Sequence, residues 1–140
     1  MADGTVRLVP TLTAGAARVA LDAAIVVATE IGVPQCIAVV DHAGDLLAFH
    51  RMDGAKSMSI ATAQAKAVTA ARTRSNSGPL PKHLGLAVAL ASDGQFTELR
   101  GGRAVLIDGQ CVGAVGVGSG SPDQDETVAD AALDSLETQT

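Results

Sequence analysis

The glycine-rich run at residues 113–126, GAVGVGSGSPDQDE, limits what this chain can fold into more than any other segment. Its glycines fall at positions 113, 116, 118 and 120, which is not the G-x-G-x-x-G spacing of a dinucleotide-binding loop. No Gly-Lys-Ser/Thr sequence follows, and only twenty residues remain after Gly120, too few for a helix and a second parallel strand. We therefore interpret the run as a final strand that turns through glycines into a helix.

The residues after these glycines carry the signals of a helix N-terminus. Ser121 can serve as the N-cap, Pro122 suits the first helical position, and Gln124 completes a capping box. Three acids then place negative charge at the positive end of the helix dipole, where it stabilises the helix and repels a phosphate group. These acids are Asp123, Asp125 and Glu126. The segment thus predicts a capped helix over residues 122–136 and argues against a nucleotide site.

Hydrophobic periodicity divides the rest of the chain into helices and strands. Helices are predicted at residues 11–31 and 57–74, with a short helical or irregular segment at residues 84–91. Strands are predicted at residues 36–40 and 46–52, and up to three more in FTELRG, GRAVLIDG and QCVGAVGVG. Tight turns at residues 42–45 and 107–110 join neighbouring strands as antiparallel hairpins.

The resulting order of elements is α-β-β-α-(α)-β-β-β-α, which predicts the α+β class with a mostly antiparallel sheet flanked by helices. Neither a repeat nor a linker divides the chain, so residues 1–140 are predicted to form a single domain. The core must be built from small side chains, because the chain has two Phe and neither Tyr nor Trp. Such a composition leaves apolar surface for a partner subunit, and we expect a homo-oligomer.

Charge and hydropathy exclude several classes of function. A net charge of −5 with scattered basic residues and almost no aromatics argues against nucleic-acid binding. The sequence has neither an apolar run long enough to span a membrane nor a secretory leader, so we expect a cytoplasmic protein. Cys36 and Cys111 lie in apolar, strand-like runs, which favours free buried thiols over a disulfide.

Two cations stand among apolar residues. Arg51 follows Leu47 and Phe49 on one face of its predicted strand, where it could pair with Asp53 or hold a substrate carboxylate. Lys66 lies in an Ala-rich helix, either as a surface lysine with a buried stem or as a desolvated group that orients an anion or moves a proton. The residues leave both alternatives open.

Three histidines are candidates for an axial haem ligand: His42, His50 and His83. No two of them have the spacing of a metal site, and the chain has no Cys-x-x-Cys motif, so no zinc site is expected. Each histidine could equally be an ordinary surface or turn residue.

Several short motifs, in this order, resemble the GlcG/HbpS family, also called the haem-degrading domain family, over residues 12–136. They are Val-Asp-x-x-Gly at 40–44, Arg-x-Asp-Gly-Ala at 51–55, Lys-Ala at 66–67, Gly-Gly at 101–102, Gly-Ala-Val-Gly-Val at 113–117 and Gln-Asp-Glu at 124–126. The resemblance implies a profilin-like or PAS-like sheet that assembles as a dimer, tetramer or octamer, and a link to haem in some members. It singles out Arg51, Asp53, Lys66, Gly101, Gly102, Asp125 and Glu126.

Three functions follow as hypotheses. The first is an oligomeric small-ligand-binding protein, with haem as the leading ligand and Arg51, Asp53, Lys66, Gly116 and Gly118 as candidate binding residues. The second is a cofactor-free lyase, isomerase or hydrolase acting on a small anionic catabolite. Arg51 would hold the carboxylate, Lys66 or His50 would move the proton, and Asp125 or Glu126 would assist. The third is an accessory subunit that binds another protein.

Overall fold

The computed structural model describes residues 4–137 and has four helices and four strands. The elements are α1 (Ala14–Glu30), β1 (Cys36–Asp41), β2 (Leu46–Arg51), α2 (Ser59–Thr73), α3 (Leu84–Ala91), β3 (Gly102–Ile107), β4 (Gln110–Gly118) and α4 (Pro122–Glu137). The strands form one sheet in the order β2-β1-β4-β3, with every neighbouring pair antiparallel. The predicted α+β class is confirmed.

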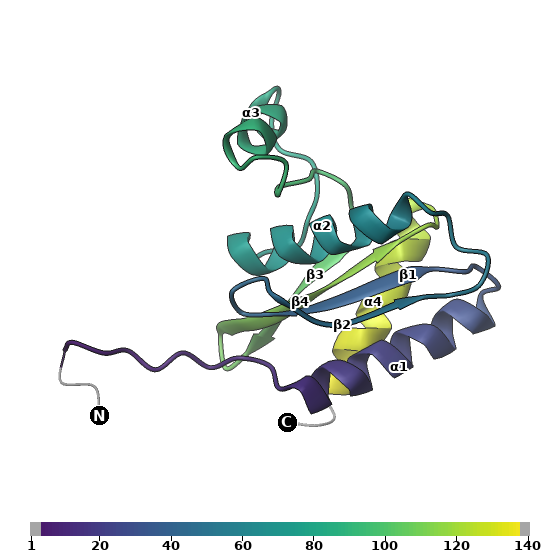
Figure 1. The fold of residues 1–140 in the computed structure, drawn as a ribbon, viewed down its shortest axis with the longest axis horizontal. Helices are drawn as coiled ribbons and strands as arrows, with labels where there is room; N and C mark the ends of the chain where they lie inside the picture. Colours follow the sequence, from purple (N-terminus) through teal and green to yellow (C-terminus); the bar gives the residue numbers. More distant parts are fainter. Residues whose placement is uncertain (1–3, 138–140) are drawn as a thin grey trace.

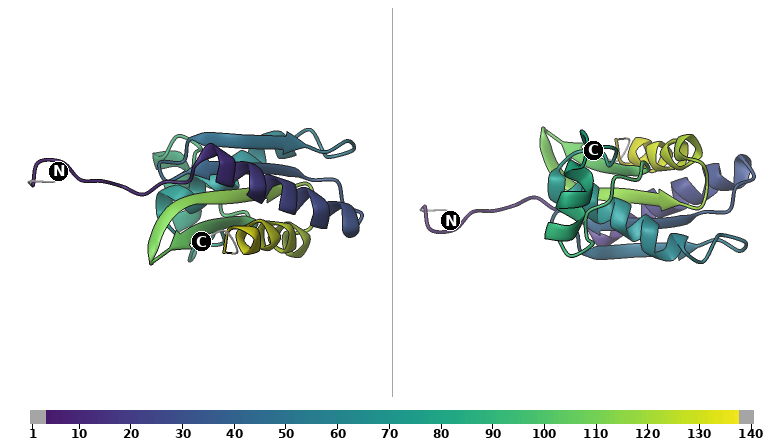
Figure 2. Two further views of the ribbon diagram at one scale, coloured as in Figure 1. Left: turned by 90° about the horizontal axis from the view of Figure 1, so that it is seen from below. Right: turned by 90° about the horizontal axis from the view of Figure 1, so that it is seen from above.

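Helices cover both faces of this sheet (Figures 1 and 2). α1 and α4 lie side by side on one face, where Ile37 and Val39 of β1 join their core. α2 covers the other face, where Ala38 and Val40 of β1 meet its alanines. The alternation along β1 explains this division, because successive side chains of a strand point to opposite faces. Both faces of the central strands are therefore buried.

Both predicted hairpin turns form. Asp41 Oδ1 accepts hydrogen bonds from the amides of Ala43 (2.9 Å) and Asp45 (3.0 Å), which closes the turn between β1 and β2. The turn between β3 and β4 has positive φ at Asp108 (52°) and Gly109 (79°), the conformation for which Asp-Gly is favoured. These two turns join the β1–β2 and β3–β4 pairs, and β1 pairs with β4 to complete the sheet.

The ends of α1 and α4 also follow their sequence signals. Thr13 caps α1 by accepting from the amide of Ala16 (3.0 Å), so the helix begins three residues later than the periodicity indicated. Ser121 and Gln124 form the predicted capping box of α4: Ser121 Oγ accepts from the Gln124 amide, and Gln124 Oε1 accepts from the Ser121 amide.

One predicted strand is wrong. The FTELRG segment, residues 96–101, forms no strand, and its residues are tied to the body by other means. The Leu99 carbonyl accepts from Ser77 Oγ (2.7 Å), and the Gly101 carbonyl accepts from the Val117 amide (3.1 Å). The segment therefore leads into β3 as an irregular connection.

Two parts of the chain stand away from this body. α3 lies beyond α2, joined to it by loops, and an extended segment at residues 4–10 precedes α1 (Figure 1). None of the helices in residues 4–137 combines the length and the apolar composition needed to cross a membrane.

Candidate functional site

A buried ion pair lies between α2 and the start of α4. Lys66 Nζ lies 2.8 Å from Asp125 Oδ2 and donates a second hydrogen bond of 2.8 Å to the Val117 carbonyl. The two side chains are only 6% and 4% exposed. The reading of Lys66 as a surface lysine is therefore wrong, and the family motifs that carry Lys66 and Asp125 meet in space.

The second oxygen of Asp125 is also satisfied. Oδ1 accepts from the Gly120 amide (2.9 Å) and, with the Gln35 amide turned so that its nitrogen faces the carboxylate, from Gln35 (2.9 Å). The same Gln35 nitrogen reaches the Gly118 carbonyl at 2.6 Å. Gln35 is fully buried, and no sequence motif had singled it out. These donors satisfy both oxygens of the buried Asp125 carboxylate and fix its orientation.

The family glycines make room for this cluster. A Cβ atom on Gly101 would lie 2.7 Å from the Val117 carbonyl oxygen and 3.1 Å from Lys66 Nζ. A Cβ atom on Gly116 would lie 2.0 Å from the Ala63 carbonyl oxygen of α2. The glycines at 102, 116 and 118 thus let α2 lie against the sheet, and Gly101 leaves room for Lys66 and Asp125.

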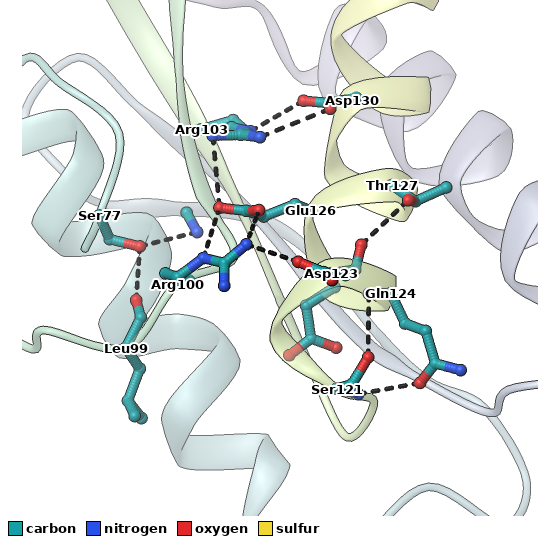
Figure 3. Close-up of polar contacts among 12 residues, drawn as sticks. Ser77, Leu99, Arg100, Arg103, Ser121, Asp123, Gln124, Glu126, Thr127 and Asp130 are labelled. Carbon is teal, nitrogen blue, oxygen red and sulfur yellow. Dashed lines mark hydrogen bonds and ion pairs between the residues drawn. The ribbon is translucent and has the colours of Figure 1, made fainter. Parts of the chain in front are cut away.

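A second, more open network ties β3 to α4 (Figure 3). Arg100 binds Glu126 (2.5 Å) and Asp123 (2.6 Å), and Arg103 binds Asp130 (2.8 Å). The hydrogen bonds from Arg100 hold the pKa of Glu126 below its usual range, with a further contribution from Arg103. Two of the predicted site acids therefore lie in different surroundings: Asp125 is buried beside Lys66, and Glu126 is half-buried beside arginines.

This geometry predicts a pH-dependent contribution to stability. Because the pKa of Glu126 is lower in the folded chain than in the unfolded chain, its stabilisation is present above about pH 4.3 and is lost as the pH falls through the folded value. Glu126→Gln should lower the melting temperature by a few degrees at pH 7, and the difference from wild type should shrink toward pH 3. Thermal unfolding at both pH values checks this.

The control is Glu30→Gln, because Glu30 is exposed at the end of α1 and forms no ion pair with a described residue. It should leave the melting temperature nearly unchanged. An equal loss for Glu126→Gln at both pH values would contradict the role given to Arg100.

Arg51, His50 and Asp53 lie elsewhere, at the end of the edge strand β2. Arg51 and His50 point to opposite sheet faces and are exposed, as is Asp53. Arg51 forms no ion pair with Asp53 or any other residue in 4–137. Arg51 stands opposite Cys36, whose thiol pKa is raised by burial more than the guanidinium lowers it. Both cysteines are free thiols, as predicted.

A cavity of about 500 Å³ opens at the other end of the sheet, beside the turn between β1 and β2. Ten residues line it: Arg7, Leu8, Val9, Pro10, His42, Ala71, Arg74, Gly109, Gln110 and Cys111. The two arginines form no ion pair within residues 4–137, and no acid lines the cavity. The cavity is thus positively charged on a chain whose net charge is −5.

His42 is the predicted site residue that this cavity contains. Its Nδ1 atom is buried and has no hydrogen-bond partner in the described part of the chain. A buried polar atom without a partner is costly, and a ligand or a small rotation of the ring could satisfy it. Of the other histidines, His50 lines a separate hollow beside α1, and His83 is exposed just before α3.

Sequence reasoning missed the other residues of this cavity. Arg7 comes from the N-terminal segment, Arg74 from the end of α2 and Cys111 from β4, so they are far apart along the chain. A basic residue in an extended segment or at a helix end is common, and none of the three stands in a recognisable motif. Only the folded chain brings them to His42.

Comparison with known proteins gives consistent matches. The family model described as haem degrading protein HbpS-like matches residues 12–134. A 15.0 kDa protein from the dhaT-dhaS intergenic region of Citrobacter freundii is 34% identical over 131 residues, 90% of this chain and 92% of that protein. A crystal structure of a double mutant of HbpS from Streptomyces reticuli has a TM-score of 0.85 and 34% identity, covering 97% and 94% of the two chains. A crystal structure of a PduOC complex with haem shares the fold, with a TM-score of 0.77 and 24% identity over 89% and 94%.

Proposed function

This chain belongs to the family of haem degrading HbpS-like proteins, and from that premise we propose that it is an oligomeric binding protein for a small anionic ligand, with haem as the leading candidate. The observation that carries the proposal is the cavity around His42. It combines an unpartnered imidazole nitrogen, two unpaired arginines and a volume of about 500 Å³. Pockets for small ligands and cofactors commonly have this size and a few convergent polar groups.

The residues present suit haem. His42 would hold the haem iron through its imidazole, and Arg7 and Arg74 would pair with the two propionate groups through charge-assisted hydrogen bonds. Leu8, Val9 and Ala71 supply apolar wall. Haem bound there would supply an iron centre able to take a further ligand or change its oxidation state. The similarity to HbpS and to the haem complex of PduOC supports this choice of ligand.

Haem titration followed by absorption spectroscopy tests the proposal. The wild-type chain should give a saturable Soret band, and His42→Ala should weaken binding by at least tenfold, because the imidazole that would hold the iron is lost. His50→Ala and His83→Ala are matched controls and should bind as the wild type does, since neither residue lines the cavity. A Soret band that is unchanged in His42→Ala, or no band for the wild type, would remove the proposal.

A second candidate function rests on the Lys66–Asp125 pair. A lysine and an aspartate buried 2.8 Å apart form a charged pair of the kind that can move a proton in cofactor-free chemistry on a small carboxylate. Arg51, His50 and Glu126 lie outside this buried cluster, so the candidate rests on Lys66 and Asp125 alone. For this function, Lys66 would have to give up one of its hydrogen bonds, to the Val117 carbonyl or to Asp125, in order to bind the substrate. The stability of a Lys66 variant therefore bears on it directly.

A further inference from the structure

Among the four helices, α3 packs least against the rest of the structure and has the most apolar sequence. Its sequence, LGLAVALA, contains no polar side chain. Yet Leu84, Leu86 and Leu90 are 51%, 60% and 75% exposed, and Gly85 is the one buried member of α3. A helix that is apolar on all sides is normally buried. α3 therefore has the composition of an interface helix.

The rest of residues 4–137 leaves most of this helix uncovered. α3 stands apart from α2 and the sheet in Figure 1. The Glu98 side chain covers Gly85, and a cavity of about 130 Å³ separates Val88 from Val68 of α2. Leu99, 50% exposed, continues the apolar surface on the segment that returns to β3.

The charges around α3 oppose its own dipole. Lys82 and His83 precede its first residue, at the positive end, and Asp93 follows its last turn, at the negative end. Lys82 and Asp93 are exposed, and neither forms an ion pair in residues 4–137. Placed beside an antiparallel helix of the same kind, each charge would lie at the end of the neighbour's dipole that attracts it.

The sequence is also symmetric in the way that such a pairing requires. A twofold axis through the middle of α3, between Ala87 and Val88, sets Lys82 of one copy opposite Asp93 of the other. The same axis sets Leu84 opposite Ala91, a large residue against a small one. Charge and shape thus fit the same arrangement.

We infer that α3 is the contact through which two copies of this chain associate, packed antiparallel across a twofold axis. The inference rests on the oligomeric assembly that is part of the proposed function, and it identifies the surface through which the copies associate. It does not depend on which ligand binds in the His42 cavity. The buried leucines stabilise the contact, and the Lys82–Asp93 pairs set its direction.

Sedimentation velocity and light scattering test the contact. The wild type should be a dimer or a larger even assembly, and Leu86→Asp with Leu90→Asp should raise the dissociation constant at the α3 contact at least 100-fold, because two charges would be buried in it. The control Val26→Asp changes a residue of α1 that is 56% exposed and should leave assembly unchanged. A monomeric wild type, or an assembly that tolerates the double substitution, would overturn the inference.

Exchanging the charges of Lys82 and Asp93 tests whether the two helices pack antiparallel. This test is informative even if the leucine variant does not fold. Lys82→Asp alone should weaken the dimer, and adding Asp93→Lys should restore it, because the pairs are rebuilt with opposite sign. If the two charge variants weaken assembly additively, or have no effect, the antiparallel pairing is wrong. Haem titration of the same variants distinguishes failure of this inference from failure of the proposed function. Loss of the α3 contact leaves the residues of the His42 cavity in place, so haem binding should be unchanged.

Discussion

Lys66→Met is expected to lower the free energy of unfolding by about 3–5 kcal/mol, as removal of one partner from a buried ion pair generally does. The variant leaves the Asp125 carboxylate buried at 4% exposure, with only the Gly120 and Gln35 donors. The Val117 carbonyl loses its lysine donor as well. Equilibrium unfolding in urea measures the loss.

Two further variants decide the interpretation. Lys56→Met removes an exposed lysine just before α2 and should change stability by less than about 0.5 kcal/mol. Adding Asp125→Asn to Lys66→Met removes the orphaned charge and should recover part of the loss. If Lys66→Met is as stable as the wild type, the pair is not needed for folding, and the proton-transfer function gains support.

Gly116→Ala is expected to cost about 3 kcal/mol or more, and if the loss exceeds the stability of the protein we expect it only in insoluble form. The added Cβ would lie 2.0 Å from the Ala63 carbonyl oxygen and 2.5 Å from the Ala67 nitrogen. Both are backbone atoms of α2, so the clash cannot be relieved by rotating a side chain. The whole helix would have to move away from β4.

The control for this substitution is Gly15→Ala. Gly15 lies in the first turn of α1, and a Cβ there would meet only Thr13 Oγ1, at 3.9 Å. Because alanine favours a helix over glycine, this variant should be as stable as the wild type or up to about 1 kcal/mol more stable. A Gly116→Ala protein with wild-type stability would show that α2 does not need close approach to β4.

Local signals in the sequence predicted most of the fold. The capping box at Ser121 and the turn at Asp108 depend on neighbouring residues alone, and both formed as predicted. Residues 96–101 were wrongly assigned as a strand, because strand-like composition does not show whether a segment pairs with an open sheet edge or is held by other bonds, here to Ser77 and Val117. The β3 edge carries no further strand in the described chain.

The candidate site was harder to predict, because its groups come from distant segments. The resemblance singled out Lys66 and Asp125, but their ion pair depends on how α2 and α4 pack against β4. His42 was one of three equivalent histidines until the fold placed it beside Arg7 and Arg74. Periodicity describes a single element, whereas a cavity is a property of several elements together.

We propose that a small anionic ligand binds in the cavity around His42. Amide chemical shifts of the isotopically labelled chain, followed during titration with the diamagnetic haem analogue gallium protoporphyrin, test it most directly. We expect the largest changes at the cavity residues His42, Arg74 and Cys111, with little change at His50 or Lys66. Changes centred on His50 or on the Lys66–Asp125 cluster, with the His42 region unaffected, would contradict the claim.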